Sequence, residues 1–449
     1  MRRAVHLFIV ASFLAIIAAP PVATLLGADG ADEVAENRKL AEFPASTLTW
    51  ANVRGFLPGL DAWFSDHFAF RQHLVRAYGI SRYMWMGVSP SPAVGLGPKG
   101  WLFFIDDGGL EDFTNQAPLT ETQLQNWRDA VVRAQKWCRA HNIGYAFTIF
   151  PDKGQIYPEL FPQTARRVNS MSRTDQILTA ISDTGAGIDV RQALRDEKRN
   201  VRVFQKTDTH WNSRGAYIGY RTVIDALRLQ VPSIPPPKPL SAFEPATRHI
   251  MGMDLAGMMG LRRVLGEEDL RLVPKEPRQY VVVEPKWNIV EAGEGRIVTE
   301  IPGSTLPRAV VFRDSFTSAM APYFSEHFSR VVYLWRNDFD VDPILAEHPD
   351  VVLQEIVSRH VQWYEPSPQV IPAPSVRTQP PGCSRASPAP ASARWRARTA
   401  DVRAAPARRE STTPSKSAAY RTWPKCRLCH RRRSTTARRD VRGGEVRKP

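Results

Sequence analysis

The sequence predicts an α/β fold with an open, mostly parallel sheet covered by helices. Short apolar runs of strand length alternate with segments of helical period through most of the chain, which is the pattern of such sheets. At 449 residues with 43% hydrophobic content, the chain can form one large domain or two ordinary ones around a sizeable core. Before position 371 the chain has a single cysteine, Cys138, so this core must hold by packing rather than by disulfides.

The clearest predicted helix runs from Thr120 to Asn142. Thr120 and Gln123 offer the chemistry of a capping box, and apolar residues then recur at helical spacing. Cys138 falls inside this pattern and is expected to be a small buried core residue. Further helical patterns cover residues 60–83, 176–182 and 215–229.

The predicted strands are short apolar runs bounded by turn residues. They cover 101–105, 143–150, 187–190, 309–312, 331–335 and 351–356. Residues 231–239 contain five prolines, and the alternation of strands and helices breaks down from there to about residue 300. We therefore expect an insertion over about 231–300 within a domain that spans 51–362.

The N-terminus predicts an export segment over residues 1–27. Arg2 and Arg3 precede an apolar run that is close to the length needed to cross a bilayer, although Pro20 and Pro21 interrupt it. The run continues past the small residues Ala18 and Ala19, which favours an uncleaved signal anchor over a cleaved signal peptide. Residues 28–50 then form a polar spacer. Either form of export places the body outside the cytoplasm.

The strong net charge of +15 comes from the C-terminal segment. Residues 371–449 contain 20 Lys and Arg against 4 Asp and Glu, whereas the rest of the chain contains 40 against 41. We predict a disordered tail over 363–449, because Arg, Pro, Ala and Ser without periodic apolar residues cannot form a core. A basic tail of this kind could bind anionic lipid, or could be a frameshifted translation. Export makes nucleic acid an unexpected partner.

A Cys-x-x-Cys-His pattern at Cys426–His430 lies in this basic segment. The pattern fits c-type haem attachment, but nothing around it resembles a haem-enclosing domain. No haem site is therefore expected.

Two short motifs supply the residue types of a catalytic triad. Asp208 and His210 are two residues apart, so the carboxylate can hold one imidazole nitrogen. Ser315 follows the apolar run 309–312, at the strand end where ligands of parallel sheets bind. Locally, His210 also fits an ordinary loop histidine and Asp314-Ser315 a helix cap, and Asp314 could replace Asp208 as the partner of His210. Asn212 or Ser213 could cap the helix that follows.

Taken together, the two motifs resemble the SGNH-hydrolase-like acetyltransferase domain of the alginate O-acetylation proteins AlgJ and AlgX. Five further segments are similar to the same family, and the resemblance spans roughly residues 50–360. They are W-F-S-D-H-F-A-F-R at 63–71, G-P-K-G-W-L-F-F at 97–104, F-P-D-K-G-Q-I-Y-P at 150–158, M-D-L-A-G-M-M-G at 253–260 and P-D-V-V-L-Q-E-I-V-S-R at 349–359.

The resemblance implies a three-layer α/β/α sandwich and an O-acetyltransferase with no metal or tightly held cofactor. Ser315 is then the nucleophile, His210 the general base and Asp208 the acid that orients it. It further implies an exopolysaccharide such as alginate as acceptor, a membrane-bound O-acyltransferase as the source of acetyl groups, and a periplasmic protein tethered to the inner membrane. The backbone N–H of Ser315, near a helix start, is a candidate oxyanion donor.

The chain departs from ordinary SGNH hydrolases in three ways. The serine follows the acid and base, the acid and base are spaced D-x-H, and Arg313 stands where those enzymes have glycine. Arg313 is therefore a candidate oxyanion or substrate residue, and Lys153 and Arg71 are candidate contacts for an anionic sugar. Structural ion pairing is the alternative for Lys153 and Arg71.

Three alternatives remain open at this stage. The same triad can pass an acyl group to water, which makes an esterase or polysaccharide deacetylase. A non-catalytic polysaccharide-binding assembly protein could also retain the fold. Finally, the aromatic residues at 63, 64, 68 and 70 could form a sugar platform, although their helical spacing favours a place in the core.

Overall fold

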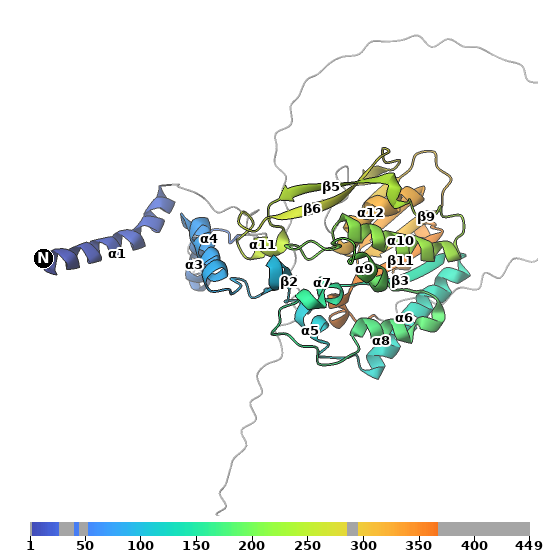
Figure 1. Ribbon diagram of the computed structural model, residues 1–449, viewed down its shortest axis with the longest axis horizontal. Helices are drawn as coiled ribbons and strands as arrows, with labels where there is room; N and C mark the ends of the chain where they lie inside the picture. Colours follow the sequence, from blue (N-terminus) through green and yellow to red (C-terminus); the bar gives the residue numbers. More distant parts are fainter. Residues whose placement is uncertain (1, 27–39, 45–52, 285–294, 367–449) are drawn as a thin grey trace, which may run out of the picture. The chain divides into compact units, whose positions relative to one another are not determined.

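The computed structural model describes residues 2–26, 40–44, 53–284 and 295–366 (Figure 1). Most of the predicted spacer over 28–50 lies outside the described residues. So do nearly all of the predicted tail over 363–449 and the Cys-x-x-Cys-His motif within it.

A seven-stranded mixed sheet forms the centre of the described body (Figure 1). Its order is β4-β3-β11-β9-β10-β8-β7, in which the first five strands are parallel neighbours and the last two pairings, β10 with β8 and β8 with β7, are antiparallel. The prediction of a mostly parallel sheet is confirmed. The strands are β3 (Gly144–Phe150), β4 (Gly187–Ile188), β7 (Val281–Glu284), β8 (Ile297–Glu300), β9 (Arg308–Arg313), β10 (Arg330–Trp335) and β11 (Val351–Val357).

Helices cover both faces of this sheet, which confirms the predicted α/β/α layering. On one face α6 (Glu121–Ala140), α8 (Arg173–Ala180) and α13 (Val341–Glu347) enclose a core that includes Trp127, Trp137 and Phe147. On the other face α10 (Ser213–Gln230) and α12 (Ser315–Phe324) enclose a core that includes Tyr217 and Met320. The remaining short helices are α5 (Gly109–Thr114), α7 (Lys153–Ile156), α9 (Arg191–Glu197) and α11 (Asp254–Met258).

Local sequence explains where the two long helices begin. The Thr120 hydroxyl accepts the Gln123 N–H while the Gln123 side chain accepts the Thr120 N–H, so α6 starts with the predicted capping box. Asn212 caps α10 by accepting the N–H groups of Arg214 and Gly215, each at 3.0 Å. Cys138 is fully buried in the α6 core, as predicted.

Two antiparallel ribbons lie outside the main sheet. The predicted strand at 101–105 forms β2 (Leu102–Phe104), which pairs with β1 (Val94–Leu96). β5 (Phe243–Ile250) pairs with β6 (Glu267–Pro274) inside the expected insertion. That region is not wholly an insertion, because β7 and β8 within it join the main sheet as its antiparallel edge.

The single helix predicted over 60–83 is wrong. The structure has α3 (Val53–His67), then α4 (Arg71–Ile80), which continues directly into a π-helical turn at Ser81–Trp85. Phe70 separates α3 from α4, since its backbone is left-handed with φ of 68°, a conformation that cannot continue a right-handed helix. The expected core place for the aromatic residues is also wrong for Phe64 and Phe70, which are exposed.

The N-terminal segment forms one helix, α1 (Arg2–Leu25), and Pro20 and Pro21 lie within it. Its 22-residue stretch Arg3–Thr24 has a mean hydropathy of 2.2. At about 1.5 Å per residue, this stretch is long enough to cross the roughly 30 Å hydrocarbon core of a bilayer. The helix therefore fits the predicted membrane anchor by length and composition.

Candidate active site

The candidate site lies at the carboxyl edge of the parallel sheet. β3, β11 and β9 are neighbours, and they end near Lys153, Arg359 and Ser315 respectively. A loop formed by residues 205–210 brings His210 to this edge. An isolated bridge between Phe204 and Trp211 closes the loop. Strand ends of a parallel sheet are where ligands bind, so the fold itself gathers these side chains.

Asp208, His210 and Ser315 form a continuous hydrogen-bonded relay. The Asp208 carboxylate lies 2.7 Å from His210 Nδ1, and it also accepts the His210 backbone N–H at 3.0 Å. His210 Nε2 lies 2.8 Å from Ser315 Oγ. These distances are those of a nucleophile, a base and an orienting acid.

Burial and charge set the protonation of this pair. Burial alone would raise the pKa of Asp208, but the charge and hydrogen bonds of His210 lower that pKa to about 2. Burial alone would lower the pKa of His210, but the neighbouring Asp208 and Asp254 carboxylates raise it above its ordinary value. Asp208 is therefore ionised over the physiological pH range, and it stabilises the imidazolium that forms when His210 takes a proton.

Lys153 fixes the backbone of the loop that carries Asp208. Its side chain is buried, and Nζ donates to the carbonyls of Gln205, Lys206 and Asp208 at 2.9, 3.1 and 2.6 Å. An ammonium has three protons, so none is left for a substrate. The predicted substrate contact of Lys153 is therefore not supported. Burial lowers the pKa of Lys153 to about 8, although nearby carboxylates oppose this shift.

The region expected to be an insertion holds the same loop from the other side. Glu267 of β6 accepts the N–H groups of Lys206 and Thr207, both at 2.8 Å. Asp254, the first residue of α11, accepts the Thr209 N–H at 3.0 Å and the Thr209 hydroxyl at 2.8 Å. The Asp208–His210 segment is thus clamped between the sheet edge and the segment 254–267.

Asp314 has a structural role and is not the partner of His210. One carboxylate oxygen caps α12 by accepting the Phe316 N–H at 2.9 Å, and the other accepts the Val357 N–H at 2.7 Å. The alternative Asp314–His210 pair is therefore excluded in this structure. Beneath it, burial raises the pKa of Glu355 well above its ordinary value, and Glu355 accepts the Asp314 N–H at 2.9 Å.

Arg313 is fully buried rather than available to a substrate. One guanidinium nitrogen donates to Ser318 Oγ at 2.8 Å, and the group lies 4.6 Å from the Trp335 ring centroid. The predicted oxyanion or substrate role of Arg313 is therefore not supported. Arg71 lies at the start of α4, where its Nε donates to the Ser65 carbonyl at 2.7 Å, and the structure does not bring it into the relay.

Ser315 occupies the first position of α12. Its N–H is therefore one of the donors at a helix N-terminus that have no partner within the helix. The helix dipole adds positive potential at the same place, which suits a developing oxyanion. Ser315 is partly buried and the His210 side chain is 30% exposed, so the relay can be reached from solvent.

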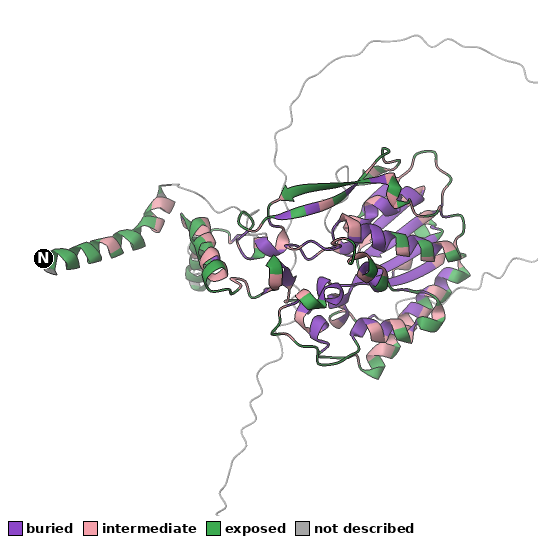
Figure 2. Cartoon of the chain, viewed as in Figure 1, coloured by how far each residue is buried: buried purple, intermediate pink, exposed green. Residues whose placement is uncertain are grey.

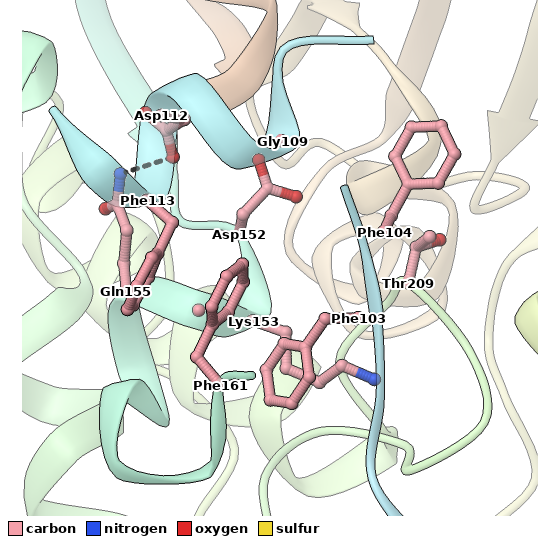
Figure 3. A pocket seen from close by; sticks show the side chains of 11 residues that line it. Phe103, Phe104, Gly109, Asp112, Phe113, Asp152, Lys153, Gln155, Phe161 and Thr209 are labelled. Carbon is pink, nitrogen blue, oxygen red and sulfur yellow. Dashed lines mark hydrogen bonds between the residues drawn. The ribbon is translucent and has the colours of Figure 1, made fainter. Parts of the chain in front are cut away.

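A small cavity adjoins the relay and is lined by phenylalanines, by buried polar groups and by Thr209 (Figure 3). Asp112 accepts from Gln155 at 2.9 Å and from Ser358 at 2.9 Å. Burial and the nearby Asp152 raise the pKa of Asp112 to about 6. Asp152 in turn binds the Arg359 guanidinium at 2.6 Å. These bonds connect the ends of β3 and β11 beside Ser315.

One cluster has the spacing of a metal site. Ligand atoms of Asp208, His210 and Asp254 lie within 4.8 Å of one another. In this structure His210 Nδ1 and both Asp254 oxygens are hydrogen-bonded within the relay and to Thr209. Hydrogen bonds among these side chains and Thr209 account for the short distances within the cluster.

Sequence reasoning missed Asp254, Glu267, Thr209 and Arg359 as parts of the site. Two of them lie in segments already noted for their family resemblance, Asp254 in 253–260 and Arg359 in 349–359. The resemblance marked these two segments as part of the domain, but it did not indicate what Asp254 and Arg359 do. Glu267 has no such signal, because its part depends on the β5–β6 ribbon folding back onto the loop.

Residues 94–286 match the family described as "SGNH hydrolase-like domain, acetyltransferase AlgX". The chain is 27% identical over 159 residues to the "Probable alginate O-acetylase AlgJ" of Pseudomonas aeruginosa. That match covers 33% of this chain and 39% of the relative, or about two fifths of its length.

Solved structures with similar folds include Bacillus cereus PatB1 and the O-acetyltransferase domain of Pseudomonas putida AlgJ. PatB1 has a TM-score of 0.45 at 16% identity and covers 60% of this chain and 96% of its own. The AlgJ domain has a TM-score of 0.41 at 18% identity and covers 61% and 94% respectively. The family match confirms the resemblance seen in the sequence, because residues 94–286 are similar to an SGNH hydrolase-like acetyltransferase domain and part of the chain is similar to AlgJ.

Proposed function

We propose that this chain is an O-acetyltransferase that moves an acetyl group through Ser315 to a hydroxyl of an exopolysaccharide. The observation that carries the proposal is the relay from Asp208 through His210 to Ser315, with distances of 2.7 and 2.8 Å. This relay lies in a chain with an acetyltransferase-type SGNH domain. A relay of this geometry supports nucleophilic acyl transfer.

In the first step His210 Nε2 takes the Ser315 hydroxyl proton while Oγ attacks the carbonyl carbon of an acetyl ester or thioester donor. The oxyanion of the tetrahedral intermediate faces the N-terminus of α12, where the Ser315 N–H stabilises it. His210 then returns the proton to the departing oxygen or sulfur. The acetyl group remains as an ester on Ser315.

In the second step a sugar hydroxyl replaces the departed donor. His210 removes its proton, the sugar oxygen attacks the acetyl-serine carbonyl, and the proton returns to Ser315 Oγ as the acetyl sugar leaves. Asp208 remains ionised throughout and stabilises the imidazolium form of His210.

The name of the curated relative supports the proposed acceptor. The curated relative is named a probable alginate O-acetylase, which favours alginate or a similar acidic polymer as acceptor. We further propose that α1 anchors the chain in the inner membrane with its body in the periplasm. A membrane-bound O-acyltransferase would then supply the acetyl groups.

The test uses the purified full chain, a chromogenic acetyl ester as donor and mannuronate oligosaccharides as acceptors. Mass spectrometry should detect acetylated oligosaccharide. Ser315→Ala should reduce its formation by roughly 10³- to 10⁶-fold, as in other enzymes that lose a triad nucleophile. Ser241→Ala, at an exposed serine outside α12, is the matched control and should retain activity.

The products separate the possible functions. Free acetate without acetylated sugar would indicate a hydrolase, and would contradict the transfer step. If Ser315→Ala leaves acetylation of the polymer in cells unchanged, the chain is a binding or assembly protein, and the proposal is wrong.

A further inference from the structure

The helical segment from α4 through the π-helical turn, Arg71–Trp85, packs on the body by one face only. Gly79 on that face is buried, and a Cβ there would lie 3.0 Å from the Met259 carbonyl oxygen. Ile80 and Tyr83 pack against the apolar cluster formed by β1, β2 and α11. This contact fixes which side of the segment faces outward.

The opposite face is apolar and exposed. Leu74, Tyr78, Arg82 and Trp85 recur at intervals of four, four and three residues, and therefore share a side of the helix; we name them the α4 outer face. Leu74 is 52%, Tyr78 54% and Trp85 84% exposed. Figure 2 shows α3 and α4 mostly exposed, in contrast to the buried strands of the sheet.

Further large apolar side chains near this face are exposed. Met84 lies within the segment, and Met86 and Val88 directly follow it. Contiguous exposed apolar side chains on a folded domain indicate a contact surface rather than a solvated face.

The charge of the segment is entirely of one sign. Residues 68–88 contain three arginines and neither Asp nor Glu. Within the α4 outer face, Arg82 donates to the Tyr78 hydroxyl at 3.2 Å and lies 5.7 Å from the Tyr78 ring centroid. Exposed Trp, Tyr and Leu side by side with arginine is the composition of helices that lie in the headgroup region of anionic bilayers.

The chain also brings this surface within reach of a membrane. α1 ends at Leu25 and α3 begins at Val53, so residues 26–52 connect the membrane-length helix to the segment. Fully extended, a connection of this length would span at most about 90 Å. The segment therefore stays close to the membrane that holds α1.

We propose that the α4 outer face docks onto the anionic surface of the bilayer that holds α1. Trp85 and Leu74 enter the headgroup and upper acyl region, while Arg82 binds lipid phosphates. This contact orients the body on the membrane. The inference does not depend on the catalytic role of Ser315.

The test places a benzophenone amino acid at Trp85 in the full chain. The protein is reconstituted into vesicles of phosphatidylethanolamine and phosphatidylglycerol that contain an alkyne-tagged lipid. The matched control carries the same probe at Leu229, which is 87% exposed at the end of α10. After irradiation, lipid attachment should be at least several-fold greater at position 85 than at 229. Arg82→Glu, or vesicles of phosphatidylcholine alone, should reduce attachment at 85.

Equal labelling at 85 and 229 would overturn the proposal, because α1 alone would then account for nearness to lipid. The same probe in native membranes tests whether a protein, rather than lipid, contacts the α4 outer face. Attachment chiefly to a membrane protein, or to a second copy of this chain, would also overturn it. Circular dichroism and thermal unfolding of each variant establish that the labelled proteins are folded.

Discussion

The two halves of the candidate site, residues 207–210 and 313–316, each place an aspartate close to a reactive side chain, yet the two aspartates act differently. Asp208 accepts from the imidazole and backbone N–H of His210. Asp314 is one residue from Ser315, but its oxygens accept the backbone N–H groups of Phe316 and Val357, and its side chain also bonds to Glu355. The first carboxylate orients a base, and the second holds a strand end against a helix start.

The supports of the two halves differ as well. The serine half is built by regular structure, since β9 leads directly into α12. The histidine half is an irregular loop, held by Lys153, Glu267 and Asp254. A loop can present a base as firmly as a helix does when buried charges on both sides satisfy its backbone groups. Substitutions can test this division of roles.

Asp208→Asn should have the largest effect. An amide in place of the carboxylate favours the wrong tautomer of His210, and a loss of about 10⁴-fold in kcat is expected with little change in stability. Steady-state kinetics and thermal unfolding measure the two quantities separately. Asp314→Asn is the comparison variant, and an equally large loss of activity from it without loss of stability would contradict the division of roles.

Lys153→Met should have the second largest effect, mainly because it lowers the stability of the fold. The substitution leaves three buried carbonyls without their donor, at a cost of roughly 1–3 kcal/mol for each group that water cannot reach. Chemical denaturation should report a lower free energy of unfolding, together with reduced kcat from a displaced Asp208. Lys198→Met, at a more exposed ion pair with Glu159, is the control. Unchanged stability in Lys153→Met would show that the loop holds without it.

Asp314→Ala should destabilise the protein by about 1–2 kcal/mol. It removes the cap of α12 and the acceptor of the Val357 N–H. The free energy of unfolding from urea titration checks this value. A loss of activity without any loss of stability would argue instead for a direct catalytic role of Asp314.

Asp254→Asn should produce the smallest change, a shift in the pH profile. The negative charge of Asp254 helps to raise the pKa of His210, and His210 must be neutral to act as a base. Activity of the wild type should therefore fall as the pH drops through this raised pKa. Without the charge the pKa falls, so the acid limb of kcat/KM should move to lower pH. Asp225→Asn on the exposed side of α10 should leave the profile in place, and a shift of Asp254→Asn to higher pH would contradict the argument.

Much of the fold could be predicted because its elements are long or strongly patterned. Strands β3, β9, β10 and β11 and helices α6 and α10 all fall close to their predicted ranges. The break at Phe70 could not be predicted, since no glycine or proline marks it and its left-handed backbone is an unusual state for phenylalanine. The antiparallel edge strands β7 and β8 could not be predicted either, because the sequence around them lacks the regular alternation of strand and helix patterns.

For the site, the sequence could indicate the chemically reactive groups but not their supports. The local patterns around His210 and Ser315 also fit a loop histidine and a helix cap, and the family resemblance is what favoured reactive roles for Asp208, His210 and Ser315. Lys153 and Arg313 are predicted to contact substrate, because a charged residue in a motif can either bind a substrate or bond within the protein. Only its burial in the folded structure distinguishes the two roles. Asp254 and Glu267 lie 44 and more residues from His210 along the chain, so only the fold could bring them to it.

The position of β11 has a consequence for how the protein is made. β11 is the last strand in sequence to join the sheet, yet it lies in the middle, between β3 and β9. As the chain emerges from the ribosome or the export channel, the strand that ends near Lys153 and the strand that ends at Ser315 have no common neighbour until residue 357 has appeared. Pairings of such long range form late in folding. The strand ends near Lys153 and Ser315 are therefore brought together only after the whole sheet-forming part of the chain has been delivered.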